Sequence, residues 1–287
     1  MTFPNETLPK GRKQKTTALY DRFVNQGAVM GDSFGLENVL WFANNKEDAH
    51  EEPTIKRSRS HDYVSREVIN VRENVGLIEV ANFSKHEFKG TDARKFLDHV
   101  MAGKLPKPGR ISLSPMLSYR GKLCGDLTVA CFDENEFMVF GSGAAQEMHR
   151  RWFESHLDKF DVNYKNRSDE FHGISIAGPN SRKVLEKIVR DDVSNEKFKF
   201  RDSRRMFVGG VPAIINRISF TGELGYEIYV APHYQIKLYE ELMEAGKEFN
   251  IKPFGGRALM SMRLEKNWGA WTLDYRPDFT AKQTGLD

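Results

Sequence analysis

The chain has 287 residues, of which 29% are charged and 39% are hydrophobic, and its 43 basic and 40 acidic residues give a net charge of +3. No apolar run approaches the roughly 20 residues that span a bilayer, so no membrane segment is expected. The charges are mixed along the chain rather than gathered into a basic stripe, which argues against nucleic acid as a partner and suits a small anionic ligand.

Residues 1–62 show little sustained hydrophobic periodicity, and we expect an extended lead-in that packs on the core. The first residues lack the apolar stretch and cleavage site of a secretory signal, and no clear transit peptide is present. This predicts a cytoplasmic location, or the mitochondrial matrix in a eukaryote. Aromatic residues predict docking rather than disorder, because disordered segments are normally poor in aromatics. The expected anchors are Tyr20, Phe23, Phe34, Trp41 and Phe42.

Residues 63–168 alternate short strand and helix patterns, which predicts a first α+β subdomain. One helix is expected to begin after Thr91, whose side chain is of the kind that caps helices. A second helix is expected at 144–157, with Met148 and Trp152 facing inward. The expected strands are 75–83, 86–89, 111–119, 123–132 and 137–140.

Residues 169–275 predict a second α+β subdomain, followed by a tail at 276–287. Hairpin-type connections outnumber crossover helices, which favours mainly antiparallel sheets with flanking helices over a doubly wound parallel sheet. The expected elements are strands at 173–177, 206–208, 211–219 and 226–230, and helices after Pro179, at 234–249 and at 257–267.

Cysteine and histidine usage predicts no disulfide and no metal. Cys124 and Cys131 lie seven residues apart in one expected strand, about 23 Å along an extended chain, which is too far to pair. Two reduced thiols indicate a reducing compartment. The eight histidines are scattered, without the spacings of a zinc or calcium site, so no protein-bound metal is expected.

The segment 123–132 places a carboxylate inside an otherwise apolar strand. Period two sets an apolar face against a less apolar one, which holds Cys124, Asp126, Thr128 and Ala130. A carboxylate in such a strand is costly unless it is paired, hydrated or used, so Asp126 is a candidate general base or charge stabiliser. A strand-end aspartate that accepts backbone hydrogen bonds at a turn is the alternative, and the residues alone leave both open.

The segment 219–230 contains two glutamates in and just after one expected turn. Gly222 and Gly225 bracket a tight turn into a strand and place Glu223 and Glu227 four residues apart. A glutamate held there can accept paired N–H donors from a heterocycle with an amidine-like edge. The same composition also fits a solvated hairpin.

Two further segments concern anions and nucleotides. Arg257 stands at the start of a helix beside free backbone N–H groups, which favours a carboxylate or phosphate, whereas Arg263 and Glu265 are expected in ion pairs. The run 141–146 half-matches a dinucleotide fingerprint, but Gln146 replaces the third glycine and no βαβ unit surrounds it. No FAD or NAD site is therefore expected, and these glycines are expected to turn the chain sharply near a ligand.

Together these motifs resemble the aminomethyltransferase (glycine cleavage T-protein) family, and most closely the C-terminal folate-binding region of dimethylglycine and sarcosine dehydrogenases. The resemblance implies tetrahydrofolate as cofactor and a two-domain α+β fold, expected in this chain to lack the family's C-terminal β-barrel domain. It covers nearly the whole chain and is carried by residues 19–21, 27–29, 75–78, 121–129, 141–146, 222–227 and 263–266.

The resemblance assigns roles residue by residue. The family's catalytic aspartate corresponds to Asp126, the pterin-binding glutamate to Glu227 rather than Glu223, and the arginine near the folate carboxylates to Arg257. Phe220 stands where the family usually has tyrosine, so a phenolic hydrogen bond is lost while ring packing is kept. Further positions that line the folate slot in relatives are Phe83, Met138, Phe140 and Ser142.

The implied activity is condensation of tetrahydrofolate with an iminium or aminomethyl group derived from dimethylglycine, sarcosine or an aminomethyl-lipoyl carrier, which forms 5,10-methylenetetrahydrofolate. Flavin-linked relatives carry an FAD domain ahead of this region. An FAD-dependent amine oxidase or dehydrogenase is therefore expected to act in trans, unless the chain is a fragment. Two alternatives stay open: a non-catalytic folate-fold regulatory or interaction subunit, and a tetrahydrofolate-dependent demethylase.

Overall fold

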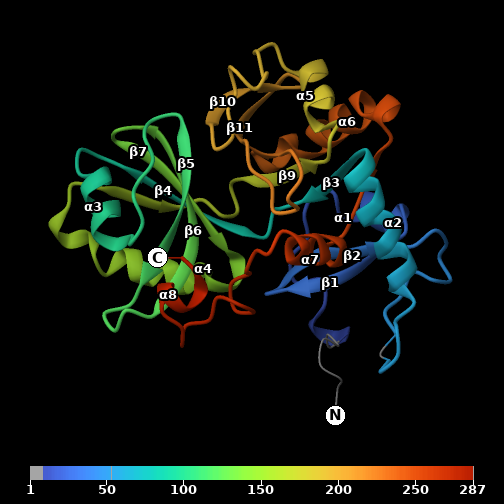
Figure 1. Cartoon of the computed structure of the whole chain (residues 1–287), viewed down its shortest axis with the longest axis horizontal. Coiled ribbons are helices and arrows are strands. Elements are labelled where there is room, and N and C mark those ends of the chain that lie inside the picture. The colour runs from blue at the N-terminus through green and yellow to red at the C-terminus, as the bar shows by residue number, and fades with distance from the viewer. Residues whose placement is uncertain (1–8, 53, 287) are drawn as a thin grey trace. The chain divides into compact units, whose positions relative to one another are not determined.

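The computed structural model describes residues 9–52 and 54–286, which fall into two compact units (Figure 1). Unit 1 takes the chain up to Ala81 together with 172–198 and 206–267, and unit 2 takes 82–171, 199–205 and the chain from Trp268 onward. Each unit is therefore assembled from separated stretches of chain. The domain boundaries expected after residues 62, 168 and 275 stay a prediction.

The first described stretch of unit 1 contains more regular structure than its weak periodicity suggested. A 3-10 turn and a short helix lead into an antiparallel hairpin, formed by η1 (Pro9–Gly11), α1 (Tyr20–Asn25), β1 (Ala28–Ser33) and β2 (Leu36–Phe42). Phe23 and Trp41 are buried as expected for anchors. Phe34 is 75% exposed, so its prediction as an anchor is wrong. It occupies the tip of the hairpin at a positive φ of 54°, which turns the ring toward solvent.

The main sheet of unit 1 is antiparallel except where β13 runs parallel to β3. Its strand order is β10 (Ser203–Val208), β11 (Val211–Asn216), β12 (Gly225–Val230), β9 (His172–Ala177), β3 (Val75–Glu79) and β13 (Ile251–Pro253). One face packs the core under α5 (Ser181–Ile188) and α6 (Gln235–Ala245). Elsewhere in the unit, α2 (Ser60–Glu73) and α7 (Gly256–Glu265) pack on each other and on β2 (Figure 1). Short 3-10 turns stand at Pro232–Tyr234 and Lys247–Phe249.

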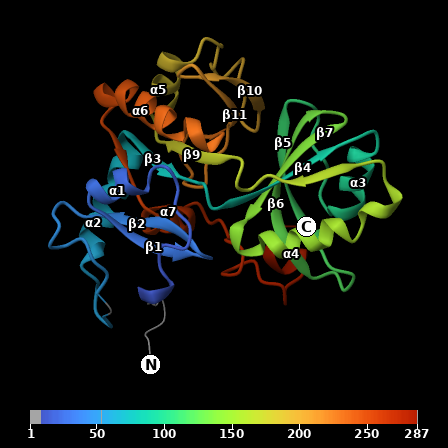
Figure 2. The same cartoon turned by 180° about the vertical axis from the view of Figure 1, so that it is seen from behind.

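Unit 2 is built on an antiparallel sheet. The strand order is β5 (Arg110–Leu117), β6 (Leu123–Asp133), β7 (Glu136–Ser142), β4 (Phe83–Lys89) and β8 (Asn163–Asn166). The apolar face of this sheet packs against α3 (Ala93–Val100) and α4 (Gln146–Glu154), which Figure 2 shows from behind. Short elements complete the unit at Gly143–Ala145, Leu157–Lys159 and Ala281–Thr284 (α8).

Two helix details in unit 2 differ from the sequence predictions. Helix α3 begins at Ala93, and the Thr91 hydroxyl donates to Asp161 at 2.8 Å instead of capping it. Helix α4 begins at Gln146 after a 3-10 turn, which turns its inward face to His149 and Phe153. Met148 is consequently 44% exposed, so its inward placement is wrong.

The fold class agrees with the sequence prediction: the chain is an α+β protein with mainly antiparallel sheets and flanking helices. Cys124 and Cys131 are both free thiols, and burial raises the pKa of Cys131 to about 11. No helix among the described residues is long and apolar enough to cross a membrane. Within the same residues, no three His, Cys, Asp or Glu side chains gather in a way that could hold a metal ion.

Candidate functional site

Five residues singled out from the sequence share one face of the unit 2 sheet. Phe83 of β4 lies opposite Ser142 of β7, and Thr128, two residues after Asp126 on β6, lies opposite Phe140. Paired residues, and alternate residues of one strand, point to the same side of a sheet. The other side is the apolar core, which holds Leu127, Val129 and Cys131 as period two predicts. The prediction is wrong for Cys124, which packs against the core, because the strand register shifts at this residue. The face carries Phe83, Asp126, Met138, Phe140 and Ser142.

Asp126 lies inside β6 rather than at its end, and it is only partly exposed. Burial raises the pKa of its carboxyl group to about 7, against a smaller opposing effect of its own backbone N–H. No ion pair to Asp126 occurs among the described residues. A carboxyl group with this pKa is about half ionised at neutral pH, which suits a group that takes up and releases a proton.

Two histidines lie on the core side of the same sheet. Burial lowers the pKa of His86 to about 3 and that of His149 to about 4, so both rings are neutral at pH 7. His86 Nδ1 shares a hydrogen bond with the Tyr164 hydroxyl at 2.9 Å. The unfolded chain takes up protons on these rings as the pH falls below 6.5 while the folded chain does not, so their contribution to stability is lost over that range.

We expect the substitution His86→Phe to make the free energy of unfolding less dependent on pH below pH 7. Between pH 7 and pH 5 the wild type should lose about 2 kcal/mol more of its free energy of unfolding than the variant. The comparison must be made against the variant because Asp126 and Glu67, whose raised pKa values lie near 7, change stability in the opposite direction. Urea unfolding at the two pH values measures the difference. Parallel profiles would contradict the burial of a neutral ring.

Glu227 belongs to the sheet of unit 1, on the face away from its helix-covered core. It is buried on β12 between Asn216 of β11 and Ser175 of β9, so the three side chains form a polar row across the strands. The hydroxyl of Tyr229, two residues further along β12, donates to Glu227 Oε2 at 2.8 Å. Burial, and then the Glu227 charge, raise the pKa of Tyr229, which keeps this donor protonated. The carboxylate is thereby held in a fixed orientation.

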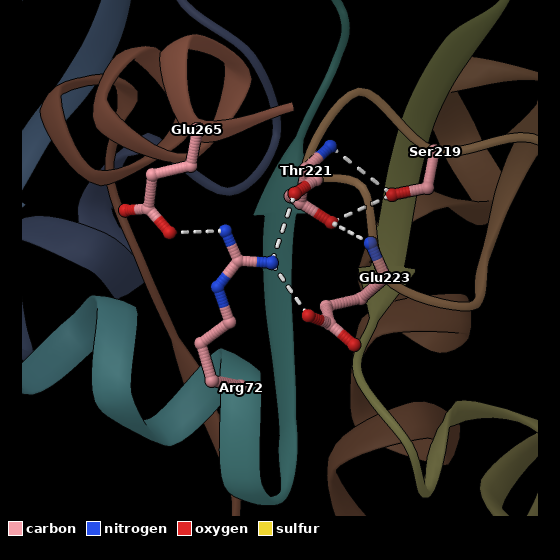
Figure 3. A network of polar contacts seen from close by, with 5 residues as sticks. All are labelled: Arg72, Ser219, Thr221, Glu223 and Glu265. Carbon is pink, nitrogen blue, oxygen red and sulfur yellow. Dashed lines mark hydrogen bonds and ion pairs between the residues drawn. The ribbon is translucent and has the colours of Figure 1, made fainter. Parts of the chain in front are cut away.

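The turn that precedes β12 is fastened from α2 (Figure 3). Arg72 donates to the backbone carbonyl of Thr221 at 3.3 Å, to Glu223 Oε1, and to Glu265 Oε2 at 2.6 Å. Within the turn, the hydroxyls of Ser219 and Thr221 lie 2.7 Å apart. Glu223 therefore serves a structural ion pair, and Glu265 is in an ion pair as the sequence predicted.

The substitution Arg72→Met should loosen this turn. We expect it to cost roughly 1–3 kcal/mol of the free energy of unfolding, because three acceptors lose their donor and two carboxylates are left close together. Arg22→Met is a matched control, since Arg22 makes one ion pair with Glu240 that is exposed on both sides. Such a pair is worth up to about 1 kcal/mol. Equal losses in the two variants, measured by chemical unfolding, would contradict a special role for Arg72.

Arg257 is already engaged by protein groups. It stands in the first turn of α7, donates to Ser60 Oγ at 2.6 Å and forms an ion pair with Glu51. The Glu51 carboxylate also accepts from the Trp41 indole. A ligand carboxylate would have to take the place of Glu51, and this role of Arg257 stays a prediction. Phe220 is half-buried in the segment between β11 and β12, and its role likewise stays a prediction.

Sequence reasoning did not single out Glu67, a buried residue of α2. Its carboxylate accepts from the backbone N–H of Phe42 at 2.7 Å and of Gly255 at 2.9 Å, which ties β2 to the start of α7. Burial outweighs these bonds and raises its pKa to about 7. Glu67, Arg66 and Lys252 are among the residues that line a cavity of about 240 Å³ in unit 1, but none of the predicted site residues does.

Comparison with known proteins places these features in a family. Residues 19–287 match the GCVT N-terminal domain. The chain is 35% identical over 289 residues to mitochondrial dimethylglycine dehydrogenase of Homo sapiens, which covers 99% of this chain and 33% of that protein. It is 33% identical over 261 residues to sarcosine oxidase subunit alpha of Rhizobium meliloti (strain 1021), covering 88% of this chain and 25% of the relative. The chain thus spans about a third or less of the length of these two relatives.

The fold comparison agrees with this assignment. Aminomethyltransferase T of the glycine cleavage system from Bartonella henselae aligns with a TM-score of 0.78 at 21% identity, over 94% of this chain and 67% of that one. Heterotetrameric sarcosine oxidase from Corynebacterium sp. U-96 aligns with a TM-score of 0.52 at 18% identity, over 68% and 97% of the two chains. The chain therefore belongs to the aminomethyltransferase (glycine cleavage T-protein) family of folate-dependent one-carbon transfer proteins.

Proposed function

We propose that the chain binds tetrahydrofolate and passes to it a one-carbon unit from an N-methyl amine, forming 5,10-methylenetetrahydrofolate. The observation that carries the proposal is Asp126, a largely desolvated carboxyl group without an ion partner among the described residues, poised to exchange a proton near pH 7. Phe83, Met138 and Phe140 on the same sheet face fit the apolar wall of a heterocycle slot.

We assign the recognition of the pterin to Glu227, which belongs to unit 1. A buried carboxylate that is oriented by Tyr229 suits the paired N–H donors of a pterin edge, since hydrogen bonds to a charged acceptor are strong. Tetrahydrofolate would supply the nucleophilic nitrogens that accept the carbon unit. Asp126 would take up the proton released as the new bond to carbon forms, and its charge would favour a cationic donor beside it.

The donor is proposed to come from oxidation of dimethylglycine or sarcosine by an FAD-dependent enzyme, either in trans or on the same polypeptide. The named relatives, a dimethylglycine dehydrogenase and a sarcosine oxidase subunit, support this source. The free thiols fit a reducing location, and we propose the cytoplasm, or the mitochondrial matrix in a eukaryote.

Identification of the folate product tests the proposal. The chain would be incubated with tetrahydrofolate, dimethylglycine and an FAD-dependent dimethylglycine dehydrogenase, with a scavenger present to remove free formaldehyde. Mass spectrometry should find more 5,10-methylenetetrahydrofolate than in a control that contains the dehydrogenase but omits this chain. A 5-methyl product would instead indicate a demethylase. Folate binding with no product above the control would indicate a non-catalytic subunit.

A further inference from the structure

Strand β6 carries an irregularity two residues before Asp126. On the neighbouring strand β5, Met116 pairs with Gly125 but Leu117 pairs with Leu123, so Cys124 is an extra residue in β6. Such a bulge breaks the hydrogen-bond ladder and redirects the side chains that follow it, and bulges are common beside active sites. The orientation of Asp126 therefore depends on how firmly this bulge is held.

The carbonyl of the extra residue is satisfied by a histidine from α4. His149 Nε2 lies 2.9 Å from Cys124 O, and since a carbonyl only accepts, Nε2 carries the proton of this neutral ring. Helix α4 lies beside β6 in both views of the fold (Figures 1 and 2). A partly buried carbonyl that loses its donor is destabilised, so the His149 ring helps to hold the bulge in place.

Two glycines make the space in which this ring sits. A Cβ atom on Gly125 would lie 2.7 Å from His149 Nε2. A Cβ atom on Gly141 of β7 would lie 3.1 Å from His149 Nδ1 and 2.6 Å from Leu127 Cδ2. Gly141 opens the motif that half-matched a dinucleotide fingerprint, and its missing side chain leaves room for His149. The expected role of these glycines near a ligand stays a prediction.

A second group of polar atoms lies behind the ring. His149 Nδ1, Ser84 Oγ and His86 Nε2 are buried without a hydrogen-bond partner among the described residues. Nδ1 and the Ser84 hydroxyl both lie 3.1 Å from the point that a Cβ on Gly141 would occupy, so they face the same spot. The Ser84 hydroxyl is thus placed to serve the acceptor side of the imidazole through one water molecule.

We propose that His149 is the positioning residue for Asp126: its Nε2–H holds the bulge carbonyl of Cys124 and its ring packs flush against Gly125. The inference rests on the proposed function of Asp126 and adds the device that keeps its carboxylate in one place. His149 itself touches no reacting atom. Its removal should therefore lower the turnover number without weakening tetrahydrofolate binding, which is assigned to Glu227.

Two substitutions of His149 distinguish a role in positioning Asp126 from a role in stabilising the fold alone. His149→Phe keeps a ring of similar size and removes the donor, whereas His149→Gln keeps an N–H at nearly the same reach. His149→Phe should lower kcat at least 10-fold relative to the wild type, while its KM for tetrahydrofolate stays within twofold of the wild-type value. His149→Gln should keep kcat within about threefold of the wild-type value. Equal kcat in His149→Phe and wild type, or equal losses in both variants with a raised KM, would overturn the proposal.

Hydrogen exchange supplies a readout that does not depend on activity. The amides of residues 123–127 should lose protection in His149→Phe and regain it in His149→Gln, while the control His156→Phe should match the wild type. His156 is a partly buried ring that also bonds a backbone carbonyl, that of Trp152 at 2.7 Å. If the wild type binds no tetrahydrofolate, the proposed function fails, and the exchange data still decide whether His149 holds this strand. Unchanged protection in His149→Phe would refute this role of His149.

Discussion

Replacing Asp126 with asparagine should lower the rate of one-carbon transfer by roughly 100- to 10,000-fold, the range that a positioned proton-transfer group contributes. The amide keeps the shape of the side chain but cannot take up the proton. Tetrahydrofolate binding should stay within about threefold of the wild type. In the wild type, kcat should rise with pH through about 7 as the carboxyl group ionises. Rapid-mixing kinetics over pH 5.5–8.5 measure both effects.

The same substitution should make the protein more stable at high pH. The folded state holds the Asp126 proton more tightly than the unfolded state, so ionisation costs stability as the pH rises from about 3.8 to about 7. At pH 8 we expect Asp126→Asn to gain roughly 1–3 kcal/mol in the free energy of unfolding, and at pH 3.5 the gain should vanish. A variant that is less stable than the wild type at pH 8 would show that the ionised carboxylate is well accommodated, which contradicts a raised pKa caused by burial.

Replacing Glu227 with alanine should raise the Kd for tetrahydrofolate by about 100-fold. Two hydrogen bonds to a charged acceptor contribute a few kcal/mol, and about 1.4 kcal/mol corresponds to a tenfold change in Kd. Glu227→Gln should lose most of the affinity as well, because an amide presents one acceptor and one donor to two N–H groups. Tyr229→Phe should weaken binding less, by about 3- to 10-fold, since it removes only the group that orients the carboxylate. Quenching of intrinsic fluorescence during a folate titration measures these values.

Glu223 provides the matched control for that series. It lies four residues away in the same turn but is committed to Arg72. We therefore expect Glu223→Gln to change the folate Kd by less than about threefold while it lowers stability. A large loss of affinity in Glu223→Gln, together with an unchanged Glu227→Gln, would assign the pterin to the other carboxylate.

The faces of the strands could be predicted from the sequence. Alternation of apolar and less apolar residues on β6 identified the side on which Asp126 lies, and the pairings with β7 and β4 then gathered the other expected residues onto that side. Tyr229 could have been found by the same reasoning, since it stands two residues from Glu227. These are local patterns, in which the period of a strand determines where a side chain points.

The partners of the charged groups could not be predicted in the same way. Arg72 meets Glu223 and Glu265 across separations of 151 and 193 residues, and Arg257 meets Glu51 across 206. No local period carries such information. The bulge at Cys124 is equally hidden, because an extra residue in one strand is defined only by the register of its neighbour. The sequence signals related to the bulge are Gly125 and Gly141, two glycines inside strands that leave room for His149.

The most direct test of the proposed function is calorimetric titration of tetrahydrofolate into the wild type, Glu227→Ala and Asp126→Ala under identical conditions. We predict one site in the wild type, a Kd raised by about 100-fold in Glu227→Ala, and nearly unchanged affinity in Asp126→Ala, whose turnover should be at least 100-fold lower. Equal binding by all three proteins, or no binding by the folded wild type, would contradict the proposed function.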